Sequence, residues 1–123
     1  MGIADKIQSA DWKKEKHAPV IECPDTVQAG ETFEVKVSVG KEIPHPNTIE
    51  HHINWIEIYF SPAGAKFAYD LGRFEFNAHG EAEAFTAPAA AVVVKLSKPG
   101  TLHAVSHCNI HGLWESEKEI KVG

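Results

Sequence analysis

The chain has 123 residues and a mass of 13.5 kDa, the size of one ordinary domain. Apolar residues make up 43% and charged residues 24%, a globular composition that excludes a disordered chain. The net charge of −5 and the single arginine, Arg73, argue against a nucleic-acid binder, which needs clustered basic side chains. No apolar segment approaches the roughly 20 residues of a membrane helix. The first residues contain no apolar signal core. We therefore expect a cytoplasmic protein without membrane contact.

The first 16 residues form a polar arm, in which the spacing of Ile3 and Ile7 fits a short helical turn as well as a loop. After the arm, the sequence predicts short β-strands separated by turns. The clearest is 32–39, where Phe33, Val35 and other apolar residues alternate with polar ones. The other predicted strands lie at 18–23, 52–60, 67–76 (one strand or two, meeting near Gly72), 81–86, 91–96, 101–108 and 115–122.

These short strands, with frequent turns and no long helix, indicate an all-β fold. We expect residues 1–123 to form a single domain, an antiparallel β-sandwich or barrel, with residues 1–16 as an irregular N-terminal arm. Two irregular segments stand out. In 40–50, two prolines fix the backbone on both sides of His45. The segment 108–114 is predicted to be a compact loop between two strands.

Histidine is more frequent than the core of a small acidic protein requires. Because histidine is the commonest metal ligand, the composition favours a metal site. Cys108 and His111 are close enough in the chain to reach one metal from a single turn. Because Cys23 is the only other cysteine, a framework of several disulfides is excluded. The eight histidines are His17, His45, His51, His52, His79, His103, His107 and His111.

Neighbouring histidines cannot all serve one metal. On a strand, His51 and His52 point to opposite faces, so only one of them should face a given ion. The rigid Pro-His-Pro setting favours His45 as a ligand. His17 ends the charged run 15–17 and, taken alone, would be a surface residue.

The remaining candidates are given structural roles. If Cys108 faces the metal, His107 on the same strand faces away from it. His79 and His103 are expected to be structural or solvent-exposed, and Cys23 to pack as a small hydrophobic residue.

The donor types narrow the metal. A structural zinc site usually uses more than one cysteine, whereas a thiolate with several imidazoles suits copper or iron. A cupredoxin-like copper protein for electron transfer would use His45, Cys108 and His111. Its weak axial methionine is missing, because Met1 is the only methionine, although a glutamine or backbone oxygen could replace it. This copper protein and a β domain with a structural metal remain as alternatives.

Four motifs resemble the superoxide reductases of the neelaredoxin and desulfoferrodoxin family. They are EKH at 15–17, KEIPHPN at 41–47, EHH at 50–52 and CNIHGLW at 108–114. They follow the family's order, and the resemblance covers essentially the whole chain. The family's two-domain form adds an N-terminal rubredoxin-like module held by four cysteines. This chain lacks those cysteines and is similar to the shorter one-iron form.

The resemblance implies a seven-stranded immunoglobulin-like β-sandwich with one mononuclear non-haem iron that cycles between Fe²⁺ and Fe³⁺. Glu15 would bind the sixth iron position in the oxidised state, and Lys16 would guide the substrate. The implied iron ligands are the imidazoles of His17, His45, His51 and His111 and the thiolate of Cys108.

The resemblance also implies the activity. The protein would reduce superoxide to hydrogen peroxide by one electron without releasing oxygen. The electron would come from an external donor such as rubredoxin, and we expect a homotetramer.

Overall fold

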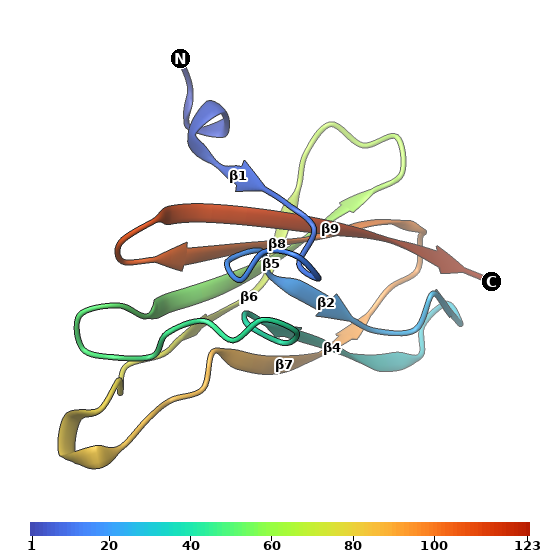
Figure 1. Ribbon diagram of the computed structural model, residues 1–123. Helices are drawn as coiled ribbons and strands as arrows, with labels where there is room; N and C mark the ends of the chain where they lie inside the picture. Colours follow the sequence, from blue (N-terminus) through green and yellow to red (C-terminus); the bar gives the residue numbers. More distant parts are fainter.

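A computed structural model describes all 123 residues and confirms the expected antiparallel β-sandwich (Figure 1). The strands are β1 Gln8–Ser9, β2 Val20–Glu22, β3 Thr26–Val27, β4 Thr32–Ser38, β5 Ile53–Pro62, β6 Tyr69–Glu75, β7 Ala89–Lys95, β8 Gly100–Cys108 and β9 Gly112–Val122. Two short 3₁₀ helices cover Ile3–Lys6 and Glu81–Glu83. No helix is long and apolar enough to cross a membrane.

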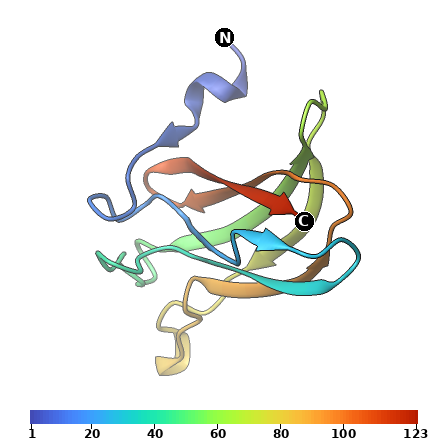
Figure 2. The same ribbon diagram turned by 90° about the vertical axis from the view of Figure 1, so that its right-hand side faces the viewer.

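The strands form two layers, which are visible from the side in Figure 2. The larger sheet has the order β1-β9-β8-β5-β6, with β3 also paired to β9, and the smaller sheet has the order β2-β4-β7. Seven of the strands have three or more residues. The two-residue strands β1 and β3 were not predicted, and both pair with β9 in parallel. Pairs as short as these depend on the neighbouring strand rather than on a local sequence pattern.

The core lies between the two sheets and follows from strand alternation. Val35 and Val37 of β4 are fully buried, while their neighbours Glu34 and Lys36 are exposed. Ile56 and Ile58 of β5 fill the same layer from the larger sheet and belong to the same hydrophobic cluster. Each fully buried side chain of this kind contributes about 1.5–3 kcal/mol. Packing in this core fixes the positions of the strand ends from which the loops extend.

The segment 81–86, predicted as a strand, is not one. It contains the 3₁₀ turn Glu81–Glu83, and its only strand-like contact is a single bridge between His79 and Phe85. The side chains of residues 81–85 are exposed, so no sheet face holds this segment extended. Ala82 and Glu83 instead adopt left-handed φ values of 54° and 59°.

Two other boundaries differ from the prediction. β6 runs through Gly72 without ending, and the register shift beside Ile58 leaves Leu71 unpaired as a bulge. The predicted loop 108–114 is shorter than expected, because Gly112 already pairs with Cys108 and begins β9.

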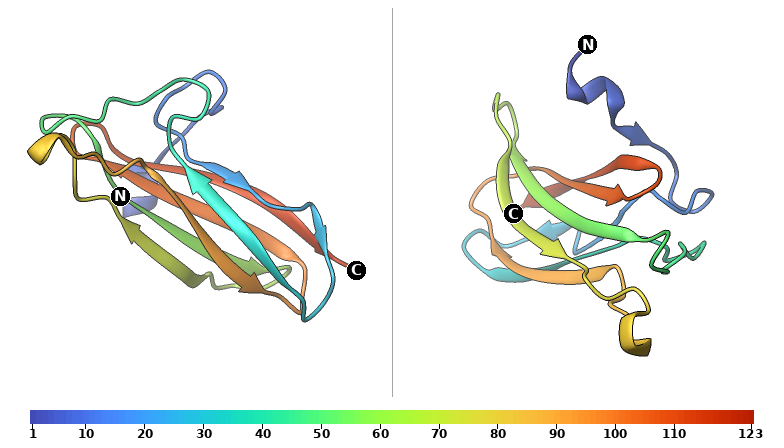
Figure 3. Two further views of the ribbon diagram at one scale, coloured as in Figure 1. Left: turned by 90° about the horizontal axis from the view of Figure 1, so that it is seen from below. Right: turned by 90° about the vertical axis from the view of Figure 1, so that its left-hand side faces the viewer.

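One end of the sandwich collects the loops of interest. The hairpin between β8 and β9, the loop before β5 and the loop after β6 lie together there, as the views from the front and from below agree (Figures 1 and 3). The N-terminal arm projects from the body of the molecule and returns along β9 through β1.

Candidate metal centre

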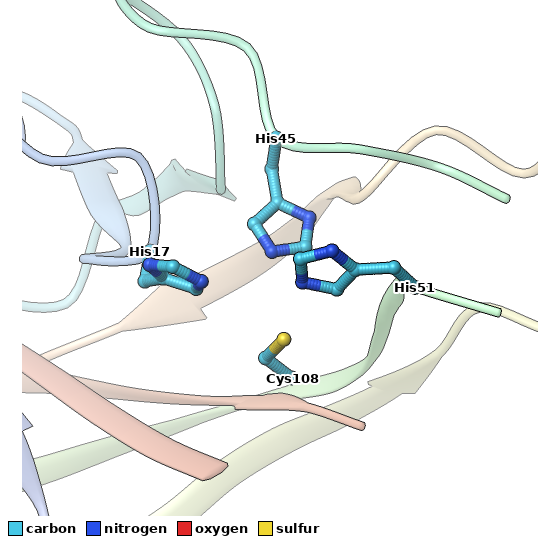
Figure 4. Close-up of side chains that lie close together, drawn as sticks. All are labelled: His17, His45, His51 and Cys108. Atoms are coloured by element: carbon cyan, nitrogen blue, oxygen red, sulfur yellow. The ribbon is translucent and has the colours of Figure 1, made fainter. Parts of the chain in front are cut away.

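Four predicted ligands from four separate segments meet at this end of the sandwich. His17 lies just before β2, His45 in the loop after β4, His51 just before β5 and Cys108 at the end of β8. One donor atom from each lies within 4.8 Å of the others. Figure 4 shows the three imidazole rings and the Cys108 sulfur directed toward one another. Three imidazoles and a thiolate around one point are a donor set for a transition metal.

Two buried nitrogen atoms in this cluster have no hydrogen-bond partner. They are Nε2 of His45 and Nε2 of His51. In His45, Nδ1 lies 2.7 Å from the carbonyl oxygen of Pro46, to which it donates, so Nε2 carries a lone pair. A buried acceptor without a partner costs about 1–3 kcal/mol. A metal ion would satisfy both atoms at once, so the residues fit the ion that the motifs imply.

His17 reaches the cluster with its ring fixed from behind. Its Nδ1 lies 2.6 Å from Oε1 of Glu15, and its backbone N–H donates to Oε2 of Glu15 over 2.7 Å. Nδ1 is therefore the donor, and Nε2 faces the cluster with a lone pair. The His17 ring also stacks on Trp114 at 4.9 Å between centroids. Carboxylate and indole together orient this imidazole.

His111 stands beside the other four residues, at the rim. Its Nδ1 lies 3.1 Å from Nε2 of His17 and 3.9 Å from Sγ of Cys108. The His111 side chain is exposed, whereas Cys108 is 1% exposed. The structure thus brings all five predicted metal ligands together, four inside and one facing solvent.

The β8–β9 hairpin explains how Cys108 and His111 meet. Cys108 pairs with Gly112, leaving three residues in the turn, and Gly112 adopts a φ of +78° that other residues rarely tolerate. The turn directs the His111 backbone N–H at the Cys108 sulfur over 3.4 Å. The Trp114 indole then donates to the His111 carbonyl over 3.2 Å. The local sequence therefore brings two of the five proposed donors together by itself.

The loop after β4 is closed tightly upon itself. Gly40 has a φ of +89°, and a Cβ atom at this position would lie 2.8 Å from the backbone nitrogen of His45. Only glycine permits this approach, so Gly40 fixes where His45 enters the cluster. On the other side, Asn109 donates to the carbonyl of Glu50 and accepts from the His52 backbone N–H at 2.8 Å. Asn109 thus joins the hairpin to the loop that carries His51.

The electrostatics keep the central imidazoles neutral. Burial lowers the pKa of His45 to about 4, and the charge of Lys16 adds to this effect. Burial also lowers the pKa of His51, with smaller contributions from His111 and Lys16. For Glu15, hydrogen bonds from His17 outweigh burial and lower the carboxyl pKa. Neutral imidazoles have the free lone pairs that metal binding needs.

The side chains of His51 and His52 point in different directions because of the loop that carries them, not because of strand alternation. Both precede β5, which begins at Ile53, so the strand argument does not apply to them. A turn closed by Thr48 and His51 places His51 in the cluster, while the His52 Nδ1 turns back to the Thr48 carbonyl at 2.8 Å. Only one of the two histidines faces the site, as the sequence predicted, but the physical reason is the turn and not strand alternation.

The other histidines lie outside the cluster. His107 donates to Oδ1 of Asn54 and stacks on Trp55 on the outer face of the larger sheet. His103 bonds to Ser61 on the same face. His79 is 6% exposed.

The donor count bears on the alternative metals. Met1 is fully exposed and supplies no axial ligand, and five donors converge where a copper site of the cupredoxin type would use fewer. Cys108 is the only cysteine in the cluster, because Cys23 packs against the hydrophobic core. A structural zinc site would normally use more sulfur.

Sequence reasoning gave no role to Asn109 or Trp114, although both stand in the CNIHGLW motif. Their hydrogen bonds run to backbone atoms of other segments or of the turn. Such contacts cannot be predicted from the spacing of residues in the sequence. The only sequence signal for a role of these residues was that the motif extends beyond its two metal donors, Cys108 and His111.

Comparison with known proteins agrees with this site. Residues 9–117 match the family described as Desulfoferrodoxin. Neelaredoxin of Megalodesulfovibrio gigas is 53% identical over 98% of this chain and 98% of its own length. Superoxide reductase of Pyrococcus furiosus is 55% identical over 97% of this chain and 99% of its own. The structure of the superoxide reductase (neelaredoxin) from Archaeoglobus fulgidus in the reduced form has a TM-score of 0.86 at 54% identity and covers 94% of this chain and 98% of that one. The chain therefore belongs to the desulfoferrodoxin family.

Proposed function

We propose that this protein is a superoxide reductase that converts superoxide to hydrogen peroxide at a mononuclear iron. The observation that carries the proposal is the cluster of three imidazoles and one thiolate, in which two buried nitrogens have no partner. Membership of the desulfoferrodoxin family supports it, since relatives more than 50% identical over nearly their whole length are named superoxide reductase or neelaredoxin.

We assign the metal ligands as the imidazoles of His17, His45, His51 and His111 and the thiolate of Cys108. Mixed imidazole and thiolate donors suit iron. Bound here, iron would supply the single electron that superoxide accepts. The reaction then balances as one superoxide anion, one electron and two protons giving one hydrogen peroxide, and no oxygen forms.

Three side chains of the protein itself would act in this reaction. Lys16 is a cation whose charge acts on His45 and His51, and it would attract the anionic substrate. Glu15 holds the Nδ1 proton of His17 and keeps Nε2 available to the metal. With oxidised iron bound, we propose that Glu15 would serve as a sixth ligand, for which its carboxylate would have to leave His17. Cys108 would hold the iron as a thiolate, and its electron density would favour release of peroxide.

The remaining assignments complete the proposal. Residues 1–123 act as a single metal-binding domain, with residues 1–16 as an arm. An external one-electron donor of the rubredoxin type reduces the protein, which works as a homotetramer in the cytoplasm.

Metal analysis of anaerobically purified protein, combined with an oxygen electrode during superoxide addition, tests the function. We expect iron in proportion to the chain, a thiolate charge-transfer band in the red region after oxidation, and peroxide formation without oxygen release. Stoichiometric copper or zinc would contradict the assignment of iron. Oxygen release in step with superoxide loss would show a dismutase instead.

A further inference from the structure

Two histidines outside the metal cluster form a face-to-face stack. The ring centroids of His52 and His79 lie 3.6 Å apart, and the ring planes differ by 4°. His79 comes from the loop between β6 and β7, where the neighbouring residues 81–85 are exposed, yet it is 6% exposed. The stack therefore joins this loop to the one that enters β5.

The position of His52 is fixed at each polar atom of its ring. Nδ1 donates to the carbonyl of Thr48 over 2.8 Å, and Nε2 accepts from the Asn54 amide over 3.2 Å. Asn54 is the extra residue at the register shift of β5 against β8, so its side chain is free to make this contact. Since His52 directly follows His51, the plane of the His52 ring restricts the backbone from which His51 projects.

His79 is anchored on its far side as well. Its Nδ1 lies 2.8 Å from Oδ1 of Asn47, and the Asn47 amide donates to the carbonyl of Thr86 over 3.1 Å. Asn47 is two residues beyond His45. The loop after β6 thus contacts the ligand-bearing segment at two points, one beside His45 and one beside His51.

The backbone of this loop is unfavourable by itself. Ala82 and Glu83 both have left-handed φ values, each of which costs about 1–2 kcal/mol for a residue with a Cβ atom. Such conformations persist where surrounding contacts hold them. At its two ends the loop is held by backbone hydrogen bonds with Asn54 and Val39. In between, the contacts that reach the body of the protein run through His79 and the Asn47–Thr86 pair.

We propose that His79 is a positioning residue of the metal centre: it acts through the flat ring contact with His52 to hold His51 in its ligand geometry. The proposal rests on the proposed metal site but not on the identity of the native metal or on superoxide chemistry. Co²⁺ is therefore a suitable probe, because its visible bands report the geometry of the ligands and do not depend on turnover.

Three variants separate the ring contact from the hydrogen bond. His79→Gln removes the ring but keeps an amide for Asn47, whereas His79→Phe keeps a flat ring and loses the hydrogen bond. His103→Gln is the matched control, because His103 lies on the outer face of the larger sheet and bonds only to residues there. Far-UV circular dichroism and thermal unfolding of the metal-free proteins report whether each variant folds.

We expect His79→Gln to lose Co²⁺ to a chelator about tenfold faster than the parent protein, as for other residues that orient a ligand, and to shift the visible bands. His79→Phe and His103→Gln should retain the parent spectrum and nearly the parent rate. If His79→Gln behaves like the parent protein, the proposal is overturned. Faster Co²⁺ loss or shifted bands in His79→Phe would also overturn it. If His79→Gln fails to fold, the result for His79→Phe decides. A parent protein without a Co²⁺–thiolate band would overturn the metal site and this proposal together. Absence of iron or of superoxide turnover would overturn only the proposed function.

Discussion

At the scale of single residues, the site depends on groups that are costly to bury without a metal. Cys108 is 1% exposed, and its sulfur has only two weak contacts, with the backbone N–H of His111 at 3.4 Å and with the His111 Nδ1 at 3.9 Å. A thiolate needs more compensation than this in the protein interior. Nε2 of His45 and Nε2 of His51 are in the same situation. A bound metal would therefore compensate the burial of these donor atoms and stabilise the fold.

The Cys108→Ser variant tests the thiolate. A serine hydroxyl is a poor anionic donor, so we expect the visible charge-transfer band to disappear and reductase activity to fall by more than about a hundredfold, beyond the range for groups that merely orient a ligand. The β-sandwich should survive, because the substitution is small. Visible and far-UV spectra together with superoxide kinetics provide the measurement. Turnover equal to that of the parent protein would contradict Cys108 as a ligand.

The adjacent histidines give a second test. His51→Ala removes a donor atom from the cluster and should lower the iron content of the purified protein. His52→Ala removes the ring that turns back to Thr48, so the iron content should stay close to that of the parent while metal is lost faster to a chelator. Metal analysis of the two variants after identical purification decides the matter. Equal iron loss in both would show that the two side chains have been assigned wrongly.

At the scale of the elements, the proposed histidine ligands are carried by loops between paired strands, and Cys108 is the last residue of β8. β4 ends at Ser38, and the chain must then reverse within a few residues to bring His45 back over the sheet. The backbone of Gly40 makes this reversal possible, because it has a positive φ and lies against the backbone of His45. The backbone conformation of Gly40 therefore determines where the proposed ligand His45 lies.

Gly40→Ala should therefore damage the site more than its backbone angle alone predicts. Gly30 is the matched control, since its φ of +79° resembles the +89° of Gly40 but nothing lies within 4 Å of a Cβ atom there. Gly30→Ala should lower the free energy of unfolding by about 1–2 kcal/mol and leave the iron content unchanged. Gly40→Ala should lose more stability and also lose iron. Denaturant unfolding and metal analysis measure both effects, and equal behaviour of the two variants would refute the close contact.

At the scale of the whole molecule, the charge opposes the proposed substrate. The net charge is −5, so the average field of the protein repels an anion such as superoxide. Lys16 is a local exception, and its charge acts on both His45 and His51. Glu15 next to it remains an anion, because hydrogen bonds from His17 outweigh the effect of burial and lower its pKa, and both of its oxygens accept from His17.

Replacing these neighbours separates attraction from ligand binding. Lys16→Ala should slow the reaction of the reduced protein with superoxide by about tenfold, which corresponds to about 1.4 kcal/mol, and should weaken its dependence on ionic strength. In protein fully loaded with iron, Glu15→Ala should leave this rate nearly unchanged, because Trp114 still stacks on the His17 ring, but it should alter the visible spectrum of the oxidised protein. Pulse radiolysis at low and high salt is the measurement. A Lys16→Ala variant that matches the parent protein at both salt concentrations would exclude a steering role.

The sequence alone was sufficient for the local features. Alternation in 32–39 predicted β4, because burial on one face repeats every second residue. The order Cys108, His111, Gly112 encodes a hairpin turn, which brings the thiolate and one imidazole together without help from the rest of the chain. The four motifs together also indicated the family.

Only the tertiary structure decided what depends on distant segments. The region 81–86 has residues compatible with a strand, but no neighbouring strand is available there, so it forms a left-handed turn instead. The separation of His51 from His52 arises from a turn held by Thr48, and the position of His79 from a contact with His52 across two loops. A metal centre built from four segments needs the packing of both sheets to bring its donors together, and packing between residues distant in sequence leaves no periodic pattern in the chain.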